Sequence, residues 1–163
     1  MQRLWSPWRL PYVSGANGPQ DCIFCSAHTS SEEGSLVIFR GSFAFVIINR
    51  FPYNTGHLMI APHRHVATLS ALTRDELSEI MVLTQRAEIA LTEAYRPEGM
   101  NVGVNLGRPA GAGVVDHVHV HIVPRWSGDT NFMTVVGEVR VLPETLEATA
   151  ARLLPLFERL GRP

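Results

Sequence analysis

The sequence predicts an α+β fold in which a mainly antiparallel sheet of about five strands carries one long helix. Short runs rich in β-branched and aromatic residues lie both before and after a single long stretch with helical spacing of apolar residues. The connections between these runs are short and hairpin-like, whereas successive parallel strands would need crossover segments. A chain of 163 residues is about the size of one domain and can bury a core without a disulfide.

The first 20 residues predict an irregular arm rather than a domain. They combine three aromatic side chains with three prolines and two glycines, and the aromatics are suited to pack the arm onto the body of the protein (Trp5, Trp8 and Tyr12). Residues 126–163 form an extension after the last predicted strand. We therefore expect one domain over residues 1–163, with an arm at one end and an extension at the other.

Five strands are predicted, three before the long helix in the sequence and two after it. The first two flank an Arg-Gly-Ser turn and predict a hairpin. The third stops at Pro62, and the fifth ends at Pro124, after a glycine-rich loop over residues 107–113. The predicted strands span residues 36–39, 43–48, 57–61, 101–106 and 115–123.

The clearest helix begins at Thr73, because Thr73 and Glu76 have the spacing of a capping box. Pro97 marks its end. A C-terminal helix is predicted to begin near Pro143, a favoured residue of the first turn, and to be kinked or ended at Pro155. Seven side chains of the long helix recur at helical spacing, and we expect them to face the sheet: Leu77, Ile80, Met81, Thr84, Ala87, Leu91 and Ala94.

Composition argues against several classes of function. Acidic and basic residues nearly balance, with a formal net charge of −1 and no basic run, which argues against binding to nucleic acid or to a membrane surface. All 14 basic side chains are arginine, which excludes a lysine Schiff base, a lysine nucleophile and a P-loop lysine. The N-terminus lacks the apolar core of a signal peptide, and no segment is apolar for long enough to span a membrane. We expect a cytoplasmic protein whose partner is a small molecule or another protein chain.

The segment His117-Val118-His119-Val120-His121-Ile122-Val123 holds three of the seven histidines within five residues. In a strand, successive side chains point to opposite faces, so the aliphatic residues face the core and the three imidazoles share the other face. Imidazoles there need polar partners, a ligand or water. A solvated face with incidental histidines is the plain alternative, and such clean alternation disfavours it.

Two functional interpretations remain for these histidines. In the first they bind a catalytic metal, although alternate residues of one strand lie too far apart for all three to reach one ion. In the second, one imidazole is a nucleophile and the others stabilise phosphate charge and transfer protons. An unperturbed histidine is about three-quarters neutral at pH 7 and therefore able to attack. We favour the second interpretation.

The pair in Cys22-Ile23-Phe24-Cys25 has the spacing of half a zinc site. In a reducing compartment its members are thiols or metal ligands rather than a structural disulfide. A redox pair would precede a helix in a βαβ unit, which the sequence does not predict. Incidental buried thiols and half of a metal site remain.

The chain resembles the histidine-triad (HIT) family, whose signature His-φ-His-φ-His-φ-φ the segment HVHVHIV matches at every position. The stretches INRFPYNTGHLMIAPHRHV and NVGVNLGRPAGAG are similar to the family's upstream segment and phosphate loop, so that the resemblance covers roughly residues 22–125. The ends, LWSPWRLPY and PRWSGDTNFMTVVG, further resemble bacterial HIT proteins related to diadenosine tetraphosphate phosphorylase.

The resemblance implies nucleotidyl transfer to His119, which attacks an α-phosphorus and forms a nucleotidyl-histidine that water or phosphate then cleaves. The other N–H of His119 is then held by the backbone carbonyl of His117, so that the attacking nitrogen stays unprotonated. His121 and His57 donate to phosphate oxygens and stabilise charge in the transition state. We expect the attacking nitrogen at an exposed sheet surface beside a cleft that admits a nucleotide.

The resemblance also implies binding residues for an adenine nucleotide or a dinucleoside polyphosphate. Two asparagines would position ribose and phosphates, and three glycines would let backbone N–H groups approach an anion, although a glycine-rich loop alone is more often a flexible connection. Many family members have Gly-Gln-Ser-Val or Gly-Gln-Thr-Val where this chain has Ala-Gly-Val-Val before the triad. The implied substrate-binding residues are Asn49, Asn105, Gly107, Gly111 and Gly113.

A structural zinc, no organic cofactor and a homodimer are further implications. The ligands implied for zinc are Cys22, Cys25, His65 and His117, a set that would pin the N-terminal arm to the sheet. If the ring of His117 binds zinc, its contribution to catalysis comes from its backbone. The alternatives to dinucleoside polyphosphate cleavage are a phosphoramidate or adenylate hydrolase, a nucleotide-binding module without turnover, and zinc itself as the catalyst.

Overall fold

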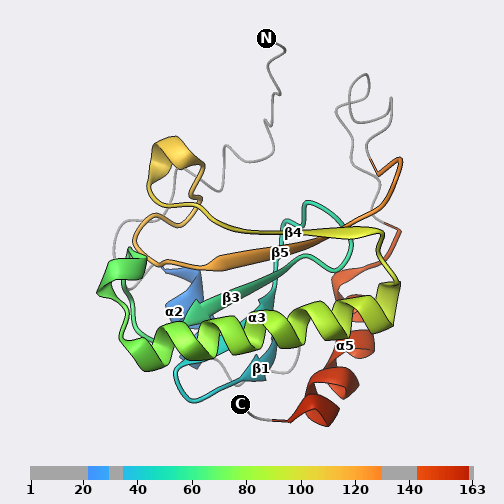
Figure 1. Ribbon diagram of the computed structural model, residues 1–163, viewed down its shortest axis with the longest axis horizontal. Helices are drawn as coiled ribbons and strands as arrows, with labels where there is room; N and C mark the ends of the chain where they lie inside the picture. Colours follow the sequence, from blue (N-terminus) through green and yellow to red (C-terminus); the bar gives the residue numbers. More distant parts are fainter. Residues whose placement is uncertain (1–21, 30–34, 130–142, 162–163) are drawn as a thin grey trace.

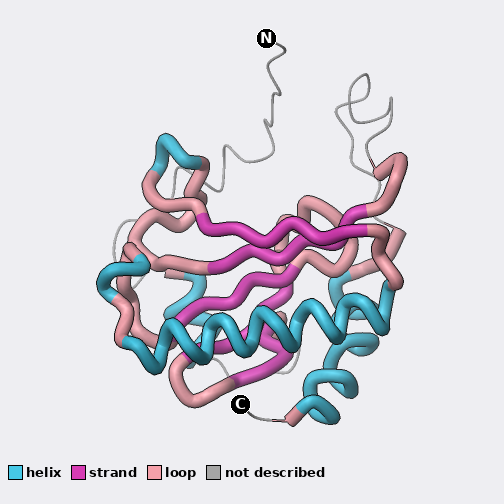
Figure 2. Tube along the Cα trace, in the orientation of Figure 1, coloured by secondary structure: helices cyan, strands magenta, loops and turns pink. Residues whose placement is uncertain are grey.

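The computed structural model describes residues 22–29, 35–129 and 143–161, and within these ranges it confirms the predicted α+β class (Figure 1). One antiparallel sheet has the strand order β1-β2-β3-β5-β4. The long helix α3 runs across one face of it, α5 packs beside α3, and the short α2 lies on the opposite face (Figure 2). The N-terminal arm, residues 1–20, lies outside the described residues.

The elements have the following bounds. The strands are β1 Val37–Arg40, β2 Ala44–Ile48, β3 Leu58–Pro62, β4 Gly99–Val104 and β5 Val120–Arg125. The α-helices are α2 Ile23–Thr29, α3 Arg74–Tyr95 and α5 Leu146–Leu160, and 3₁₀ turns cover Leu69–Ala71 and Arg108–Ala110.

Alternation along the strands divides the core into two clusters. In β2, Val46 and Ile48 face α3 and α5, whereas Phe45 and Ile47 face α2. The same alternation holds in β3, whose residues are all buried. The α2 cluster includes Cys22 and Phe24, so the cysteine pair is anchored on the sheet face opposite the long helix.

Helix α3 begins as predicted and turns a different stripe toward the sheet. Thr73 caps it, and the reciprocal bonds of the capping box with Glu76 are both present. The predicted inward residues Leu77 and Met81 are 38% and 60% exposed. Glu76 and Glu79 are buried in their place. Each carboxylate accepts several hydrogen bonds, which compensates the burial of its charge. Of the other predicted inward residues, Ile80, Thr84, Ala87 and Leu91 are buried and Ala94 packs against the core.

Strand β5 begins at Val120 rather than Val115, so His117 and His119 precede the strand. The ladder with β3 stops at the pair Ile60↔Val120. Two residues further along β3 is Pro62, which has no N–H to donate. The backbone N–H of Val118 turns instead to the carbonyl oxygen of Val66, at 2.7 Å.

Of the predicted proline boundaries, the chain passes two, since neither Pro124 nor Pro155 ends its element. Strand β5 runs through Pro124 to Arg125, where it pairs only with β4, because its pairing with β3 ends at Ile122. Helix α5 continues past Pro155 to Leu160. That helix begins at Leu146 because the Thr145 hydroxyl accepts from the N–H of Ala148 and caps it. No helix within the described ranges is long and apolar enough to cross a bilayer.

Candidate active site and metal-binding site

The three histidines of the triad are placed in two different environments. His117 and His119 are 0% and 4% exposed, and His121 is half-buried. The Phe24 ring from α2 packs against the first two, with centroids 5.1 Å and 4.7 Å from theirs. The expectation of an exposed sheet surface is therefore wrong for His117 and His119, because α2 covers this part of the sheet.

His119 is held in a defined tautomer. Its Nδ1 lies 2.8 Å from the backbone oxygen of His117, and a carbonyl oxygen only accepts, so Nδ1–H is the donor. A neutral ring then carries its lone pair on Nε2. Burial lowers the pKa of His119, partly opposed by the bond to His117, and this favours the neutral ring. The geometry that the family resemblance implied for a nucleophile is thus present.

His57 and His121 form a hydrogen-bonded pair. The Tyr53 backbone N–H donates to Nδ1 of His57 at 3.0 Å, which places the proton of a neutral His57 on Nε2. That Nε2 lies 2.9 Å from Nδ1 of His121, which accepts the bond and keeps its own proton on Nε2. The rings of His121 and His119 are 4.7 Å apart. His57 is 0% exposed, and its Nε2 is directed at His121.

Asn49 lies beside His57 at the start of the β2–β3 loop. Its Oδ1 accepts the N–H of Phe51 at 2.9 Å, and its Nδ2 lies 3.3 Å from Nδ1 of His57. Its backbone N–H donates to the carbonyl oxygen of His57. Because Asn49 is only 8% exposed, its contacts shape the loop that holds His57.

The glycine-rich segment forms a closed loop between β4 and the triad. Asn105 is half-buried, and its Nδ2 donates to the carbonyl oxygen of Gly111 at 3.4 Å. Gly107 and Gly111 have φ of 79° and 88°, a conformation that residues with a Cβ rarely adopt. Gly113 is half-buried and lies outside that region. Asn49 is thus joined to the triad through His57, while Asn105 belongs to this separate loop.

Four side chains converge into one cluster beside the triad, with all ligand atoms within 4.8 Å of one another (Cys22, Cys25, His65 and His117). The sulfur atom of Cys22 lies 3.4 Å from Nδ1 of His117, and that of Cys25 lies 3.3 Å from Nδ1 of His65. Tetrahedral zinc with ordinary bond lengths sets sulfur and nitrogen ligands about 3.6 Å apart. The cluster therefore fits a tetrahedral ion with no ligand position left open.

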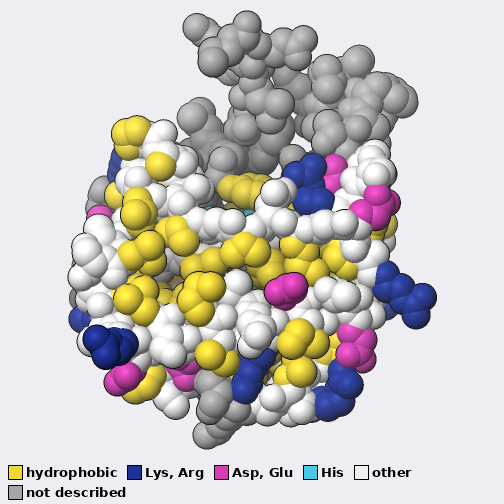
Figure 3. Space-filling model, viewed as in Figure 1, with side chains coloured by type: hydrophobic (Ala, Val, Ile, Leu, Met, Phe, Trp, Pro, Cys, Tyr) yellow, Lys and Arg dark blue, Asp and Glu magenta, His cyan; other side chains and the backbone are white. Residues whose placement is uncertain are grey.

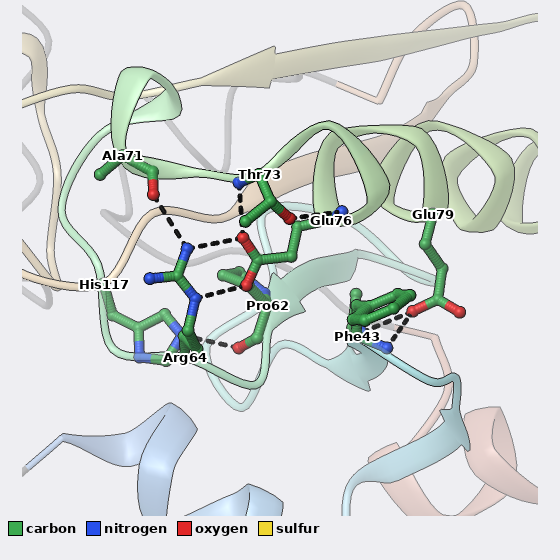
Figure 4. A network of polar contacts seen from close by, with 9 residues as sticks. Phe43, Pro62, Arg64, Ala71, Thr73, Glu76, Glu79 and His117 are labelled. Atoms are coloured by element: carbon green, nitrogen blue, oxygen red, sulfur yellow. Dashed lines mark hydrogen bonds and ion pairs between the residues drawn. The ribbon is translucent and has the colours of Figure 1, made fainter.

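The ring of His117 is prepared for metal binding. Its Nε2–H donates to the carbonyl oxygen of Pro62 at 2.9 Å (Figure 4). The lone pair of Nδ1 is then left toward the two thiols. Burial lowers the pKa of His117 to about 4, so the ring is neutral near pH 7. Burial, and then the neighbouring Cys22, raise the pKa of Cys25 to about 11, a shift that a bound cation would reverse.

Three features that support the site were missed by the sequence analysis. The ion pair between Arg64 and Glu76, at 2.6 Å, joins the segment carrying His65 to the first turn of α3 (Figure 4). The Tyr53 N–H that fixes His57 is a backbone group, so no residue type in the sequence signals it. Phe24 stood between two predicted ligands, and apolar character alone did not mark it.

The HIT domain family model matches residues 30–128. The chain belongs to the HIT domain family. This confirms the resemblance drawn from the histidine signature.

Among HIT relatives, the chain is 41% identical over 167 residues to the AP-4-A phosphorylase of Mycobacterium tuberculosis (strain CDC 1551 / Oshkosh), a match covering 98% of this chain and 86% of the relative. It is 29% identical over 130 residues to the bis(5'-adenosyl)-triphosphatase of Dictyostelium discoideum, covering 76% and 87% of the two chains. The first similarity agrees with the predicted phosphorylase-related branch.

Solved HIT structures share the fold. A Zn-bound histidine triad family protein from Mycobacterium smegmatis superposes with a TM-score of 0.70 at 25% identity, covering 88% of this chain and 97% of that one. A hypothetical histidine triad nucleotide-binding protein from Sulfolobus tokodaii strain7 has a TM-score of 0.70 at 26% identity, covering 85% of this chain and 93% of that one.

Proposed function

We propose that the protein is a HIT-family enzyme that cleaves dinucleoside polyphosphates such as diadenosine tetraphosphate through a nucleotidyl group on His119. The observation that carries this proposal is the 2.8 Å bond from Nδ1–H of His119 to the backbone oxygen of His117, which leaves Nε2 unprotonated. The similarity to an AP-4-A phosphorylase over nearly the whole chain supports the substrate class.

The chemistry is a double displacement at an α-phosphorus. The Nε2 lone pair of His119 forms a P–N bond while the P–O bond to the remaining polyphosphate breaks. Phosphate or water then attacks the same phosphorus, and the P–N bond breaks. His121, whose tautomer places a proton on Nε2, donates to a phosphate oxygen, and His57 positions His121. Asn49 shapes the loop of His57, and the loop of Asn105, Gly107, Gly111 and Gly113 supplies backbone N–H groups to the phosphates from positions other than Gly111, whose own N–H donates to the carbonyl oxygen of Arg108 at 2.9 Å.

An assay that pairs diadenosine tetraphosphate with water alone and with added phosphate tests this proposal. Formation of ADP only when phosphate is supplied identifies phosphorolysis, and formation of AMP in water identifies hydrolysis. Turnover of phosphoramidates or adenylates in preference to diadenosine tetraphosphate would identify the broader hydrolase branch. Binding of AMP without cleavage of any of these substrates would contradict the enzymatic proposal and indicate a binding module.

We infer that the cluster of Cys22, Cys25, His65 and His117 binds a structural zinc. Four protein ligands complete a tetrahedron, whereas a catalytic zinc keeps one position for water or substrate. When bound, zinc would supply a cross-link between α2 and the segments that carry the two histidines. We also place the protein in the cytoplasm, whose reducing conditions keep the two cysteines as thiols able to bind a metal. Elemental analysis should find one zinc per chain, and a folded, metal-free and fully active sample would contradict any catalytic part for zinc.

We infer that the protein is a homodimer formed through β4 and the neighbouring face of α3. Strand β4 is an edge of the sheet, and edge strands expose unpaired backbone groups. Hydrophobic side chains gather over one face of the molecule (Figure 3). The exposed hydrophobic residues of α3 and β4 include Met81, Ile89 and Val102, at 60%, 45% and 53%. Val102→Arg should convert a dimer to a monomer in light scattering, whereas Leu154→Arg on α5 should not. A wild-type monomer at all concentrations would contradict this inference.

A further inference from the structure

We propose that Phe24 is a positioning residue for His119. The proposal rests on the proposed function of His119 as the nucleophile. It concerns a side chain that lies between two candidate metal ligands and, through its ring, orients the imidazole that attacks phosphorus.

The position of the Phe24 ring carries the argument. Phe24 is the second residue of α2, is fully buried, and has its centroid 4.7 Å from that of His119, with the ring planes at 42°. The His121 ring lies 4.7 Å from the same imidazole with planes at 71°. Substitution of Phe24 therefore alters the packing of the two triad histidines that it contacts.

A hydrogen bond alone restrains His119 incompletely. The bond from Nδ1–H to the oxygen of His117 fixes one edge of the ring, but a ring held at one edge still rocks about that edge. Contact with the Phe24 ring restrains that motion, and with it the direction of the lone pair on Nε2. Small errors in the direction of attack reduce rates strongly, so this restraint bears on the chemical step.

The cysteine pair fixes Phe24 in turn. Cys22 and Cys25 lie on either side of it in the sequence, and their sulfur atoms lie 3.4 Å and 3.7 Å from Nδ1 of His117. The same segment therefore presents thiols to His117 and an aromatic ring to His119. Leucine or methionine in place of Phe24 keeps the apolar bulk and all four candidate ligands but removes the ring face.

Phe45 provides a matched control. It is also a fully buried phenylalanine of the α2 cluster, and its ring lies 6.4 Å from that of Phe24. Within the described residues, its ring contacts are with Phe24, His28 and His63 rather than with the triad. Phe45→Leu thus creates a comparable loss of ring packing without removing a contact to His119.

The experiment compares purified Phe24→Leu, Phe24→Met and Phe45→Leu with the wild-type protein. We expect the Phe24 variants to keep wild-type zinc content and to lose about 10- to 100-fold in kcat on diadenosine tetraphosphate, with KM within about twofold. In ¹⁵N–¹H spectra without substrate, the His119 ring signals should shift and broaden as the ring gains motion, while the Nδ1–H tautomer set by the His117 carbonyl is retained. Phe45→Leu should leave the His119 signals unchanged.

The spectra separate failure of this inference from failure of the proposed function. A kcat of the Phe24 variants within about twofold of wild type, or His119 ring signals that match those of wild type, would overturn the positioning role. Full activity of His119→Asn would instead overturn the nucleophile itself. If both Phe24 variants fail to fold, the wild-type protein decides: nuclear Overhauser contacts between the Phe24 and His119 rings are expected, and their absence overturns the inference.

Discussion

His117 contacts His119 through its backbone carbonyl and the cysteine pair through its side chain. Its carbonyl oxygen accepts the Nδ1–H of His119 at 2.8 Å, while its own Nδ1 lies 3.4 Å from the sulfur of Cys22. A substitution of the ring leaves the carbonyl in the chain. The two roles can therefore be separated by mutation.

His119→Asn should lower kcat/KM by about three orders of magnitude or more, because it removes the nitrogen that forms the covalent bond. Binding of AMP, measured by calorimetry, should change little. His117→Asn should lose zinc but keep the backbone carbonyl, and we expect a smaller loss of about tenfold. A larger loss of rate in His117→Asn than in His119→Asn would contradict this division of roles.

Removal of the metal should lower stability more than the loss of one surface contact. Cys25→Ser removes one ligand of a four-ligand cluster, and the binding free energy of a structural zinc contributes to folding. We expect a lower midpoint of thermal unfolding, little further change on adding a chelator, and a zinc content near zero. Ser26→Ala, at the exposed neighbouring position, should behave as wild type in the same melts.

Residue type and spacing predict many of the residues of this site, but they do not predict its buried polar contacts. The signature HVHVHIV and the Cys22–Cys25 spacing identified the histidines and thiols that the structure brings together. Alternation alone placed His117 and His119 in a strand, because it takes no account of Pro62 ending the ladder on the neighbouring strand. The pairing of His57 with His121 was not predicted, because the hydrogen bond from the Tyr53 backbone that orients His57 cannot be read from residue types.

The long helix shows the same limit. The capping box at Thr73 was predicted and is present, since its residues are local in sequence. The buried face of the helix differs from the predicted one because it includes Glu76 and Glu79. Hydrogen-bond partners of these two carboxylates lie 12 and 35–37 residues away along the chain. Helical spacing of apolar residues gives no sign of a carboxylate that is buried because distant groups bond to it.

Glu76 should make stability depend on pH in the acid range. Its hydrogen bond with Arg64 is the main cause that lowers the pKa of Glu76 to about 2, from an ordinary value of 4.5. A carboxyl with a lowered pKa in the folded state stabilises the protein above its unfolded pKa, and this contribution is lost as the pH falls from about 4.5 to about 2.

Glu76→Gln should destabilise the protein near pH 7 by no more than about 1 kcal/mol, because Arg64 is half exposed and water screens the pair. The variant should also flatten the loss of unfolding free energy between about pH 4.5 and 2. Urea unfolding across this range measures both effects, with Glu88→Gln at an exposed position of α3 as the control. Equal pH slopes for Glu76→Gln and wild type would contradict the assignment.

The turn between β1 and β2 depends on the absence of a side chain at Gly41. The Glu79 carboxylate accepts the N–H groups of Ser42 and Ala44 at 2.8 Å and 2.7 Å, and a Cβ on Gly41 would lie 2.8 Å from that carboxylate. Gly41→Ala should destabilise the protein by about 1–3 kcal/mol by displacing these bonds. Gly99→Ala, where a Cβ would meet nothing within 4 Å, should change the unfolding free energy by less than about 0.5 kcal/mol. Equal effects of the two substitutions would argue against this account of the turn.

Trapping the covalent intermediate tests the central claim most directly. The protein is mixed with diadenosine tetraphosphate labelled at the α-phosphorus, quenched within one turnover in alkaline denaturant, digested, and analysed by mass spectrometry. We predict one adenylyl group on His119, released by acid because its P–N bond is acid-labile, and no label on His119→Asn. Label on another residue, or rapid product formation with no labelled protein at any time, would contradict nucleophilic attack by His119.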